Sequence, residues 1–139
     1  MGTGVIVGAA IVRAGSVLAA QRAYPDDLAG RWELPGGRVE PGESDAEALR
    51  RECREELAAE IVVGIRLGDD VDLPGGGVLR ISSATLIDPS TEPVAVEHRA
   101  LRWVTPGELG AVDWLPADRI LVPALRDLLR APPLHRLSG

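Results

Sequence analysis

Three glutamates lie close together in the stretch RRECREEL, which covers residues 50–57. Glu52, Glu55 and Glu56 are one to four positions apart, so on a helix they would share an arc of about 100°. Like charges at such spacings destabilise a helix by about 0.2–0.5 kcal/mol per pair, so their crowding needs a reason. Clustered carboxylates suit the binding of a hard divalent cation or proton transfer in catalysis, whereas a solvated acidic face is the ordinary alternative.

The residues around these glutamates have the pattern of a helix over 45–58. Ser44 and Glu47 predict a capping box at its start. Apolar residues recur every four positions and predict a buried stripe beside the carboxylate arc. This stripe consists of Leu49, Cys53 and Leu57. The arginines of the helix fall outside the arc, so we expect them to be segregated from the carboxylates. They are Arg50, Arg51 and Arg54.

A glycine pair precedes the helix in LPGGRVEPGES, residues 34–44. Gly36 and Gly37 tolerate a positive φ and a close backbone approach, so we expect a sharp turn that exposes carbonyl groups. A backbone carbonyl beside carboxylates is the oxygen-rich ligand set that Mg²⁺ or Mn²⁺ prefers. An ordinary strand-to-helix loop is the alternative for the glycine pair alone.

Residues 37–59 together resemble the Nudix box, G-x5-E-x7-R-E-U-x-E-E-x-G-U, where U is apolar. Every charged position matches, and Cys53 fills an apolar one. The matching residues are Gly37, Glu43, Arg51, Glu52, Glu55 and Glu56. Ala58 and Ala59 depart from the pattern, because the box has glycine and a larger apolar residue there. Both lie at the helix end, away from the carboxylates.

The resemblance implies an α/β fold, an α/β/α sandwich around a mixed β-sheet, in which the box forms a loop–helix–loop. It also implies a site for Mg²⁺, with Mn²⁺ as a substitute. The implied metal ligands are the carbonyl of Gly36 and the carboxylates of Glu52, Glu55, Glu56 and Glu97. Glu97 is nominated because VEHRALRWV resembles the segment that supplies a further glutamate in MutT-like members.

Two box residues have implied supporting roles. Arg51 would orient the carboxylates through a charge-assisted contact, and Glu43 would support the loop or an outer-shell ligand. Glu52 or Glu97 would act as the general base, and the sequence does not distinguish between them.

The flanking segments resemble the branch that contains MutT-like enzymes and CTP pyrophosphohydrolases. They are AQR (20–22), AGRWELPGG (29–37), EHRALRWVTPGEL (97–109) and VDWLPADR (112–119). This implies hydrolysis of a nucleoside triphosphate to the monophosphate and pyrophosphate, as in sanitation of the nucleotide pool. The leading substrates implied are (d)CTP and 5-methyl-dCTP, or an oxidised purine nucleotide such as 8-oxo-dGTP.

Asp118 stands where MutT-like enzymes have a base-reading amide. An ionised aspartate accepts hydrogen bonds, for instance from the amine of cytosine, whereas a protonated one also donates. Trp114 and Leu115 are predicted to flank the base and Leu34 to line the pocket floor. Phosphate binding is predicted for Arg22 and Arg38. The structural alternatives are a helix N-cap for Asp118, a core position for Trp114 and solvated charges for the two arginines.

Two other functions within the same family are weighed. One is an ADP-ribose or nucleotide-sugar pyrophosphatase, whose members carry a proline beyond the box, but Pro74 is explained by a hairpin turn. The other is a non-catalytic nucleotide sensor, which would be expected to lack box carboxylates. An unrelated α/β domain with an acidic helix is a third alternative.

The chain as a whole suits one domain over residues 1–139. Its net charge of −6 argues against nucleic acid as a partner, so a small nucleotide is the partner expected. The single cysteine and the lack of a run of about 18 apolar residues favour a cytoplasmic protein that does not cross a membrane. A monomer and a homodimer are both compatible with the sequence.

Alternating apolar patterns and turn residues predict the elements that must position these residues. Strands are expected over 4–13, 16–22, 31–37, 60–73, 77–88 and 99–104. Thr105 and Pro106 predict a short helix over 105–109, and a last helix is expected within 119–130. Residues 131–139 are expected to form a frayed tail.

Overall fold

The computed structural model describes residues 4–131 and contains the predicted order of strands and helices. The elements are β1 (Val5–Arg13), β2 (Ser16–Gln21), β3 (Trp32–Glu33), β4 (Gly36–Arg38), α1 (Asp45–Leu57), β5 (Ile61–Asp72), β6 (Val78–Leu86), β7 (Ala100–Val104), the 3₁₀ helix η1 (Pro106–Ala111), α2 (Pro116–Ile120) and α3 (Val122–Arg130). The last helix predicted within 119–130 is confirmed as α3, whereas α2 before it was not predicted. The single strand predicted over 31–37 is two short strands, β3 and β4. The predicted frayed tail lies outside the described residues, apart from Ala131.

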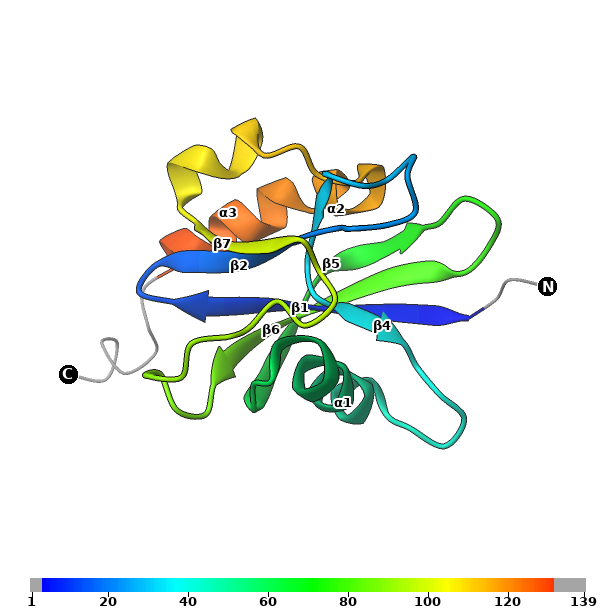
Figure 1. The fold of residues 1–139 in the computed structure, drawn as a ribbon, viewed down its shortest axis with the longest axis horizontal. Coiled ribbons are helices and arrows are strands. Elements are labelled where there is room, and N and C mark those ends of the chain that lie inside the picture. Colours follow the sequence, from blue (N-terminus) through cyan, green and yellow to red (C-terminus); the bar gives the residue numbers. More distant parts are fainter. Residues whose placement is uncertain (1–3, 132–139) are drawn as a thin grey trace.

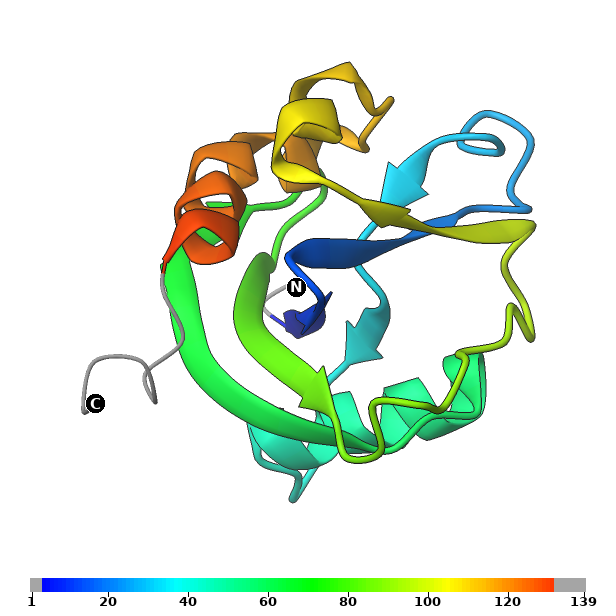
Figure 2. The same ribbon diagram turned by 90° about the vertical axis from the view of Figure 1, so that its left-hand side faces the viewer.

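The sheet is mixed, as predicted. Its strands follow the order β3-β2-β1-β6-β5, with β4 paired to β1 and β7 paired to β2. The pairing of β1 with β6 is parallel, and the other pairings are antiparallel. Figure 1 shows α1 on one face of the sheet and η1, α2 and α3 on the other, and Figure 2 shows how strongly β5 curves around β6.

Strand β1 separates the two layers of the core. Val7, Ala9 and Ile11 pack under α1, whereas Ala10 belongs to the core beneath η1 and α3. This alternation follows from the two-residue period of a strand. The site-bearing helix therefore packs against a central, largely buried strand of the sheet.

Helix α1 begins and packs as its sequence predicts. The Ser44 hydroxyl accepts a hydrogen bond from the Glu47 N–H at 3.1 Å, and the Glu47 carboxylate accepts one from the Ser44 N–H at 2.8 Å. The predicted stripe is fully buried under the sheet. It comprises Leu49, Cys53 and Leu57. Burial of the Cys53 thiol raises its pKa to about 12, so it is an inert core residue.

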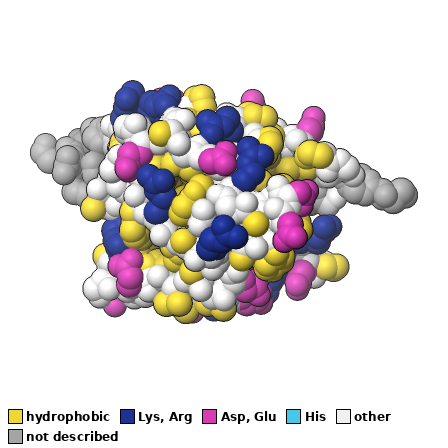
Figure 3. All heavy atoms as spheres, turned by 45° about the horizontal axis from the view of Figure 1, so that its top comes forward, with side chains coloured by type: hydrophobic (Ala, Val, Ile, Leu, Met, Phe, Trp, Pro, Cys, Tyr) yellow, Lys and Arg dark blue, Asp and Glu magenta, His cyan; other side chains and the backbone are white. Residues whose placement is uncertain are grey.

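The charge pattern of the surface is mixed. With η1, α2 and α3 brought forward, arginines and acidic side chains are interspersed over this face (Figure 3). Within residues 4–131, no helix combines the length and the apolar character needed to cross a membrane.

The end of α1 carries backbone strain. Ala58 has φ 52° and ψ 40°, the left-handed conformation that glycine adopts without a steric penalty. Its N–H donates to the Arg54 carbonyl at 3.2 Å, and the Ala59 N–H donates to the Cys53 carbonyl at 3.3 Å. The position at which the Nudix box has glycine therefore keeps the glycine conformation here with an alanine.

Replacing Ala58 with glycine is expected to stabilise the protein by about 1 kcal/mol, because it removes the contact between Cβ and backbone in the left-handed region. Urea unfolding measures the change. The matched control is Ala48→Gly in the helical interior, which is expected to destabilise by about 1 kcal/mol or more. A loss of stability in both variants would mean that the strain at Ala58 is negligible.

Candidate active site

The glycine pair lies in a strand rather than in the predicted sharp turn. Gly36 and Gly37 belong to β4 and pair with Gly8 and Val7 of β1. A Cβ on Gly36 would lie 1.9 Å from the Val7 carbonyl oxygen, and one on Gly37 would lie 1.6 Å from Oε2 of Glu52. These glycines are therefore required for close approach, and neither has a positive φ. Gly37 allows Glu52 of the box helix to lie against the backbone of β4, and Gly36 allows β4 to lie close to the backbone of β1.

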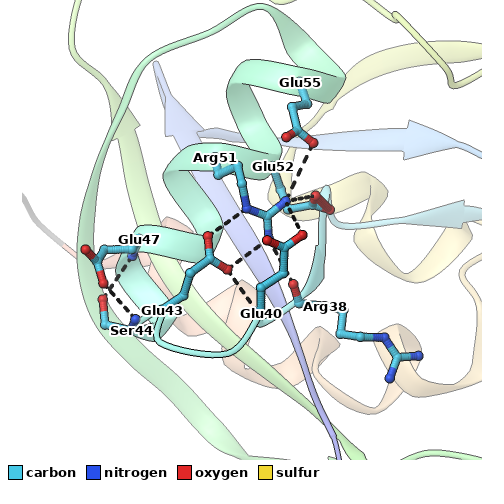
Figure 4. Close-up of polar contacts among 8 residues, drawn as sticks. All are labelled: Arg38, Glu40, Glu43, Ser44, Glu47, Arg51, Glu52 and Glu55. Carbon is cyan, nitrogen blue, oxygen red and sulfur yellow. Dashed lines mark hydrogen bonds and ion pairs between the residues drawn. The ribbon is translucent and has the colours of Figure 1, made fainter.

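The Arg51 guanidinium joins the loop, the helix and β4 (Figure 4). Its Nε and Nη2 donate to the carboxylate of Glu43 at 2.7 and 2.9 Å. Nη1 donates to Oε1 of Glu52 at 2.7 Å, and Nη2 also donates to the Arg38 carbonyl at 3.0 Å. A further ion pair joins Arg51 to Glu55 at 3.6 Å.

These contacts correct one prediction. Arg51 is not segregated from the carboxylates, although its Cα lies outside their arc on the helix. An arginine stem is long enough to carry the charged head around the helix, which a helical projection of Cα positions ignores. Arg50 follows the prediction, because no ion-pair partner lies within 4 Å of it among residues 4–131.

The loop carboxylate of Glu43 is held in its ionised form. Its hydrogen bonds from Arg51 and from the Glu40 N–H lower its pKa to about 2. The same contact raises the pKa of Arg51 further above its usual value. Glu43 thus acts as a fixed negative charge that orients Arg51.

The helix carboxylates differ in their surroundings. Burial raises the pKa of Glu52, and it raises the pKa of Glu56 to about 7. Glu56 accepts a hydrogen bond from the Gly36 N–H at 3.2 Å, whereas Glu55 has 59% of its side chain exposed. Burial disfavours the ionised form of a carboxylate, and a nearby cation favours it. A bound cation would therefore stabilise the ionised forms of Glu52 and Glu56 the most.

A small cleft lies beside Glu56. It encloses about 50 Å³, which is room for a few water-sized groups but not for a nucleoside. Its lining residues are Arg22, Ala23, Tyr24, Glu33, Glu56, Glu97 and His98. The structure thus brings Glu97, predicted from a distant loop, to the same cleft as Glu56 of the box.

Glu33 and His98 are two polar residues of the cleft that no sequence pattern predicted. Glu33 receives hydrogen bonds from Arg22 at 3.2 and 3.3 Å and lies 2.9 Å from Nε2 of His98. Burial opposes the charged form of His98, but the hydrogen bond and charge of Glu33 and the charge of Glu56 raise its pKa above the usual value. In the sequence, the one sign that His98 belongs to the cleft is its position directly after Glu97.

Asp118 is buried inside α2 and is not a helix N-cap. Its Oδ2 accepts a hydrogen bond from the Leu34 N–H at 2.9 Å, and its side chain is 5% exposed. The N-cap position of α2 belongs to Leu115. Burial raises the pKa of Asp118 to about 7, so its protonated and ionised forms are both populated near neutral pH. The predicted base reader therefore both accepts and donates hydrogen bonds at that pH.

The other residues predicted near the base have different environments. Trp114 is fully buried, and its indole N–H donates to the Leu109 carbonyl at 2.9 Å, so it holds the core position that the sequence left open. Leu115 is half-buried and anchors this segment to β3 through a hydrogen bond to the Trp32 carbonyl at 2.8 Å. Leu34 is buried, and the Arg38 side chain is exposed and extends away from the carboxylates (Figure 4).

The donor set suits a hard divalent cation in its chemistry. Carboxylate oxygens are the ligands that Mg²⁺ prefers, and Gly37 leaves Glu52 a cradle against the backbone that any side chain would fill. As they stand, no three acidic, histidine or cysteine side chains among residues 4–131 converge closely enough to hold a metal ion. Glu52 is held by Arg51, and the Glu55 side chain is exposed.

A larger hollow lies elsewhere on the molecule. It encloses about 500 Å³ between β5 and the α2–α3 corner. Its lining residues are Gly68, Asp69, Asp70, Val71, Asp72, Ile120, Leu121, Pro123 and Ala124. None of the predicted site residues lines it, so it is separate from the carboxylate cleft.

Comparison with known proteins identifies close relatives. The model of the NUDIX domain matches residues 2–130. A "Putative 8-oxo-dGTP diphosphatase 2" of Mycobacterium tuberculosis is 52% identical over 118 residues, which cover 83% of this chain and 82% of that protein. A "CTP pyrophosphohydrolase" of Escherichia coli is 39% identical over 128 residues, covering 92% and 95%. The solution structure of the E. coli ORF135 protein superposes with a TM-score of 0.78 at 38% identity, covering 96% of both chains.

Arg51→Lys is expected to lower the free energy of unfolding by about 1–2 kcal/mol. A single ammonium cannot donate to Glu43, Glu52 and the Arg38 carbonyl in the directions that the planar guanidinium allows. Chemical denaturation measures the loss, with Arg50→Lys on the same helix as the control, expected within about 0.5 kcal/mol of the parent. Equal stabilities of the two variants would show that the Arg51 contacts do not hold the loop to the helix.

Proposed function

The chain belongs to the Nudix hydrolase family, and we propose that it cleaves nucleoside triphosphates to the monophosphate and pyrophosphate with the help of Mg²⁺ or Mn²⁺. The observation that carries the proposal is the placement of Glu56 of the box and Glu97 of a distant segment at one cleft, beside a Glu52 held by Arg51. Such a reaction would serve to sanitise the nucleotide pool of the cytoplasm.

The box carboxylates are the proposed metal site. The cation would be held by the Gly36 carbonyl and by the side chains of Glu52, Glu55, Glu56 and Glu97. When bound, the cation would neutralise phosphate charge and lower the pKa of the attacking water molecule. Arg51 fixes Oε1 of Glu52, which leaves Oε2 beside Gly37 as the free oxygen of that carboxylate.

Proton removal from the attacking water is assigned to one of two carboxylates. Glu52 is half-buried, and burial raises its pKa and so strengthens it as a base, whereas its contact with Arg51 favours the ionised form and opposes this effect. Glu97 is exposed at the cleft, without such a contact among the described residues. Both remain candidates for the general base.

Recognition of the nucleotide is assigned to residues that follow β2, lie in or just before β4, and lie in or just before α2. Arg22 lines the cleft and is proposed to contact phosphate together with Arg38. Asp118, which accepts a hydrogen bond from the Leu34 N–H, is proposed to read the base, and Leu115 is proposed to flank it. The names of the two relatives support CTP or 8-oxo-dGTP as substrate. We propose dCTP and 5-methyl-dCTP as further substrates, because they carry the same base or its methylated form. Trp114 is proposed to act from the core by fixing this segment.

Glu55→Gln and Glu56→Gln are each expected to lower kcat at saturating Mg²⁺ by at least about 10²-fold. Loss of one carboxylate removes several kcal/mol of charge stabilisation through the metal. Release of pyrophosphate from dCTP, CTP, 5-methyl-dCTP, 8-oxo-dGTP, dATP and ADP-ribose provides the measurement. Glu60→Gln, an exposed glutamate paired with Arg54 outside the site, is the control and should retain parental turnover. Unchanged turnover in the first two variants would refute the metal site.

Asp118→Asn is expected to change the ranking of these substrates, because an amide always donates whereas the ionised carboxylate only accepts. The exposed Asp113, which pairs with Arg31, provides the control variant Asp113→Asn, expected to keep the parental ranking. An unaltered ranking in Asp118→Asn would mean that this side chain has a structural role alone.

The same variant has a predicted effect on the pH dependence of stability. Folding raises the pKa of Asp118 from 3.8 to about 7, so the stability that its protonated form supports is complete below pH 4 and is lost as the pH rises to 7. The parent is therefore expected to lose about 2 kcal/mol more than Asp118→Asn between pH 5 and pH 8 in urea titrations. Parallel curves for the two proteins would contradict the buried, proton-binding state of Asp118.

A further inference from the structure

His98 is a buried residue beside an exposed one. It follows Glu97 directly, and its side chain is 7% exposed. Its Nε2 lies 2.9 Å from Oε2 of Glu33. An ionised carboxylate only accepts hydrogen bonds, so Nε2 carries the proton and donates it. The other ring nitrogen, Nδ1, is buried without a hydrogen-bond partner among residues 4–131, so the bond to Glu33 is the polar contact that holds the ring.

The end of β2 brings this pair together. Glu33 of β3 lies opposite Ala20, and on the other side of β2 the Arg99 N–H donates to the Gln21 carbonyl at 2.8 Å. Arg22 follows at once and donates to both carboxylate oxygens of Glu33 at 3.2 and 3.3 Å. Glu33 is therefore occupied by Arg22 and His98 and is itself held in place.

The segment that carries Glu97 has few other anchors. Between β6 and β7 it runs without regular secondary structure beside α1 (Figures 1 and 2). Before Glu97, the Val96 N–H donates to the Glu56 carbonyl at 3.2 Å. After it, the His98 ring is bonded to Glu33. The direction of the exposed Glu97 side chain is thus set by the Val96 backbone contact on one side. On the other side it is set by the His98 ring together with the Arg99 N–H, which donates to the Gln21 carbonyl at 2.8 Å.

We propose that His98 is a positioning residue that, through Glu33 and Arg22, holds this segment so that Glu97 faces Glu56 across the cleft. The inference rests on the proposed role of Glu97 as a metal ligand. Without this side-chain anchor, the backbone contacts alone would hold the segment, and the cation would have to restrict the remaining freedom of Glu97, which would weaken binding. Partners that orient a metal ligand typically contribute 10–100-fold to metal affinity, so loss of the anchor is expected to weaken Mn²⁺ binding by about tenfold.

The test uses two amide variants of the full chain. In His98→Gln the amide nitrogen reaches about as far as Nε2 and can still donate to Glu33, whereas the amide of His98→Asn is one methylene shorter and cannot reach it. Binding of Mn²⁺ to the metal-free protein is measured by electron paramagnetic resonance. Hydrogen exchange of the Val96 and Arg99 amides is measured on the same samples, and thermal unfolding verifies that each variant is folded.

The expected result is a roughly tenfold weaker Mn²⁺ affinity and faster exchange of both amides in His98→Asn, with near-parental values in His98→Gln. In a Glu97→Gln background, His98→Asn is expected to cause no further loss of affinity, because the effect acts through Glu97. Equal behaviour of the two amide variants, or the same loss in the Glu97→Gln background, would overturn the positioning role.

The outcomes separate this inference from the proposed function. Unchanged Mn²⁺ affinity in Glu97→Gln alone would remove the ligand role of Glu97 and the positioning role built on it. A weaker affinity in Glu97→Gln with parental affinity in His98→Asn would overturn the positioning role alone. Both readouts are independent of turnover, so an absence of hydrolysis across the nucleotide panel would contradict the proposed function without affecting them.

Discussion

The contact made by the Arg51 guanidinium is the constraint on which the site depends. It joins a loop carboxylate, a helix carboxylate and a carbonyl of β4, from Glu43, Glu52 and Arg38. A planar guanidinium donates in fixed directions, so these three groups are held in one relative position. Glycine at position 37 allows that position, because a side chain there would collide with Glu52. The arrangement of the other carboxylates follows from how closely α1 approaches β4.

This arrangement is unfavourable for the carboxylates themselves. Burial raises the pKa of Glu52 and Glu56, which means that the fold disfavours their charged forms. A helix selected for stability alone would carry apolar side chains at such positions, since a buried charge is destabilising unless it is compensated. Arg51 compensates Glu52 in part, and no arginine contacts Glu56 among the described residues. In the proposed metal site, a divalent cation at the cleft would supply the missing compensation.

Local patterns predicted the parts of the structure that depend on neighbours in sequence. The capping box of Ser44 and Glu47 and the stripe of Leu49, Cys53 and Leu57 are formed within one helix, so their spacing is sufficient to identify them. The hairpin of β5 and β6 follows from the glycine-rich turn between two apolar runs. In contrast, the left-handed conformation of Ala58 was not expected, because the sequence shows a residue that normally avoids it.

Contacts between distant segments could not be predicted from local sequence patterns. Glu33 lies in a strand of two residues and meets His98 across 65 positions, so no periodic pattern marks either residue as part of the site. Asp118 resembled a helix cap, yet its partner is the backbone of Leu34, 84 positions away. Arg51 was misplaced because a helical projection ignores the length of its side chain. These errors arose where a side chain reaches beyond its own element.

Anomalous diffraction from crystals grown with Mn²⁺ and a non-hydrolysable dCTP analogue tests the central claim most directly. The claim predicts manganese peaks within about 2 Å of carboxylate oxygens from Glu52, Glu55 or Glu56, with phosphate oxygens completing the coordination and Arg51 still bonded to Glu43. Manganese bound only through the nucleotide, with the box carboxylates uncoordinated, would contradict it.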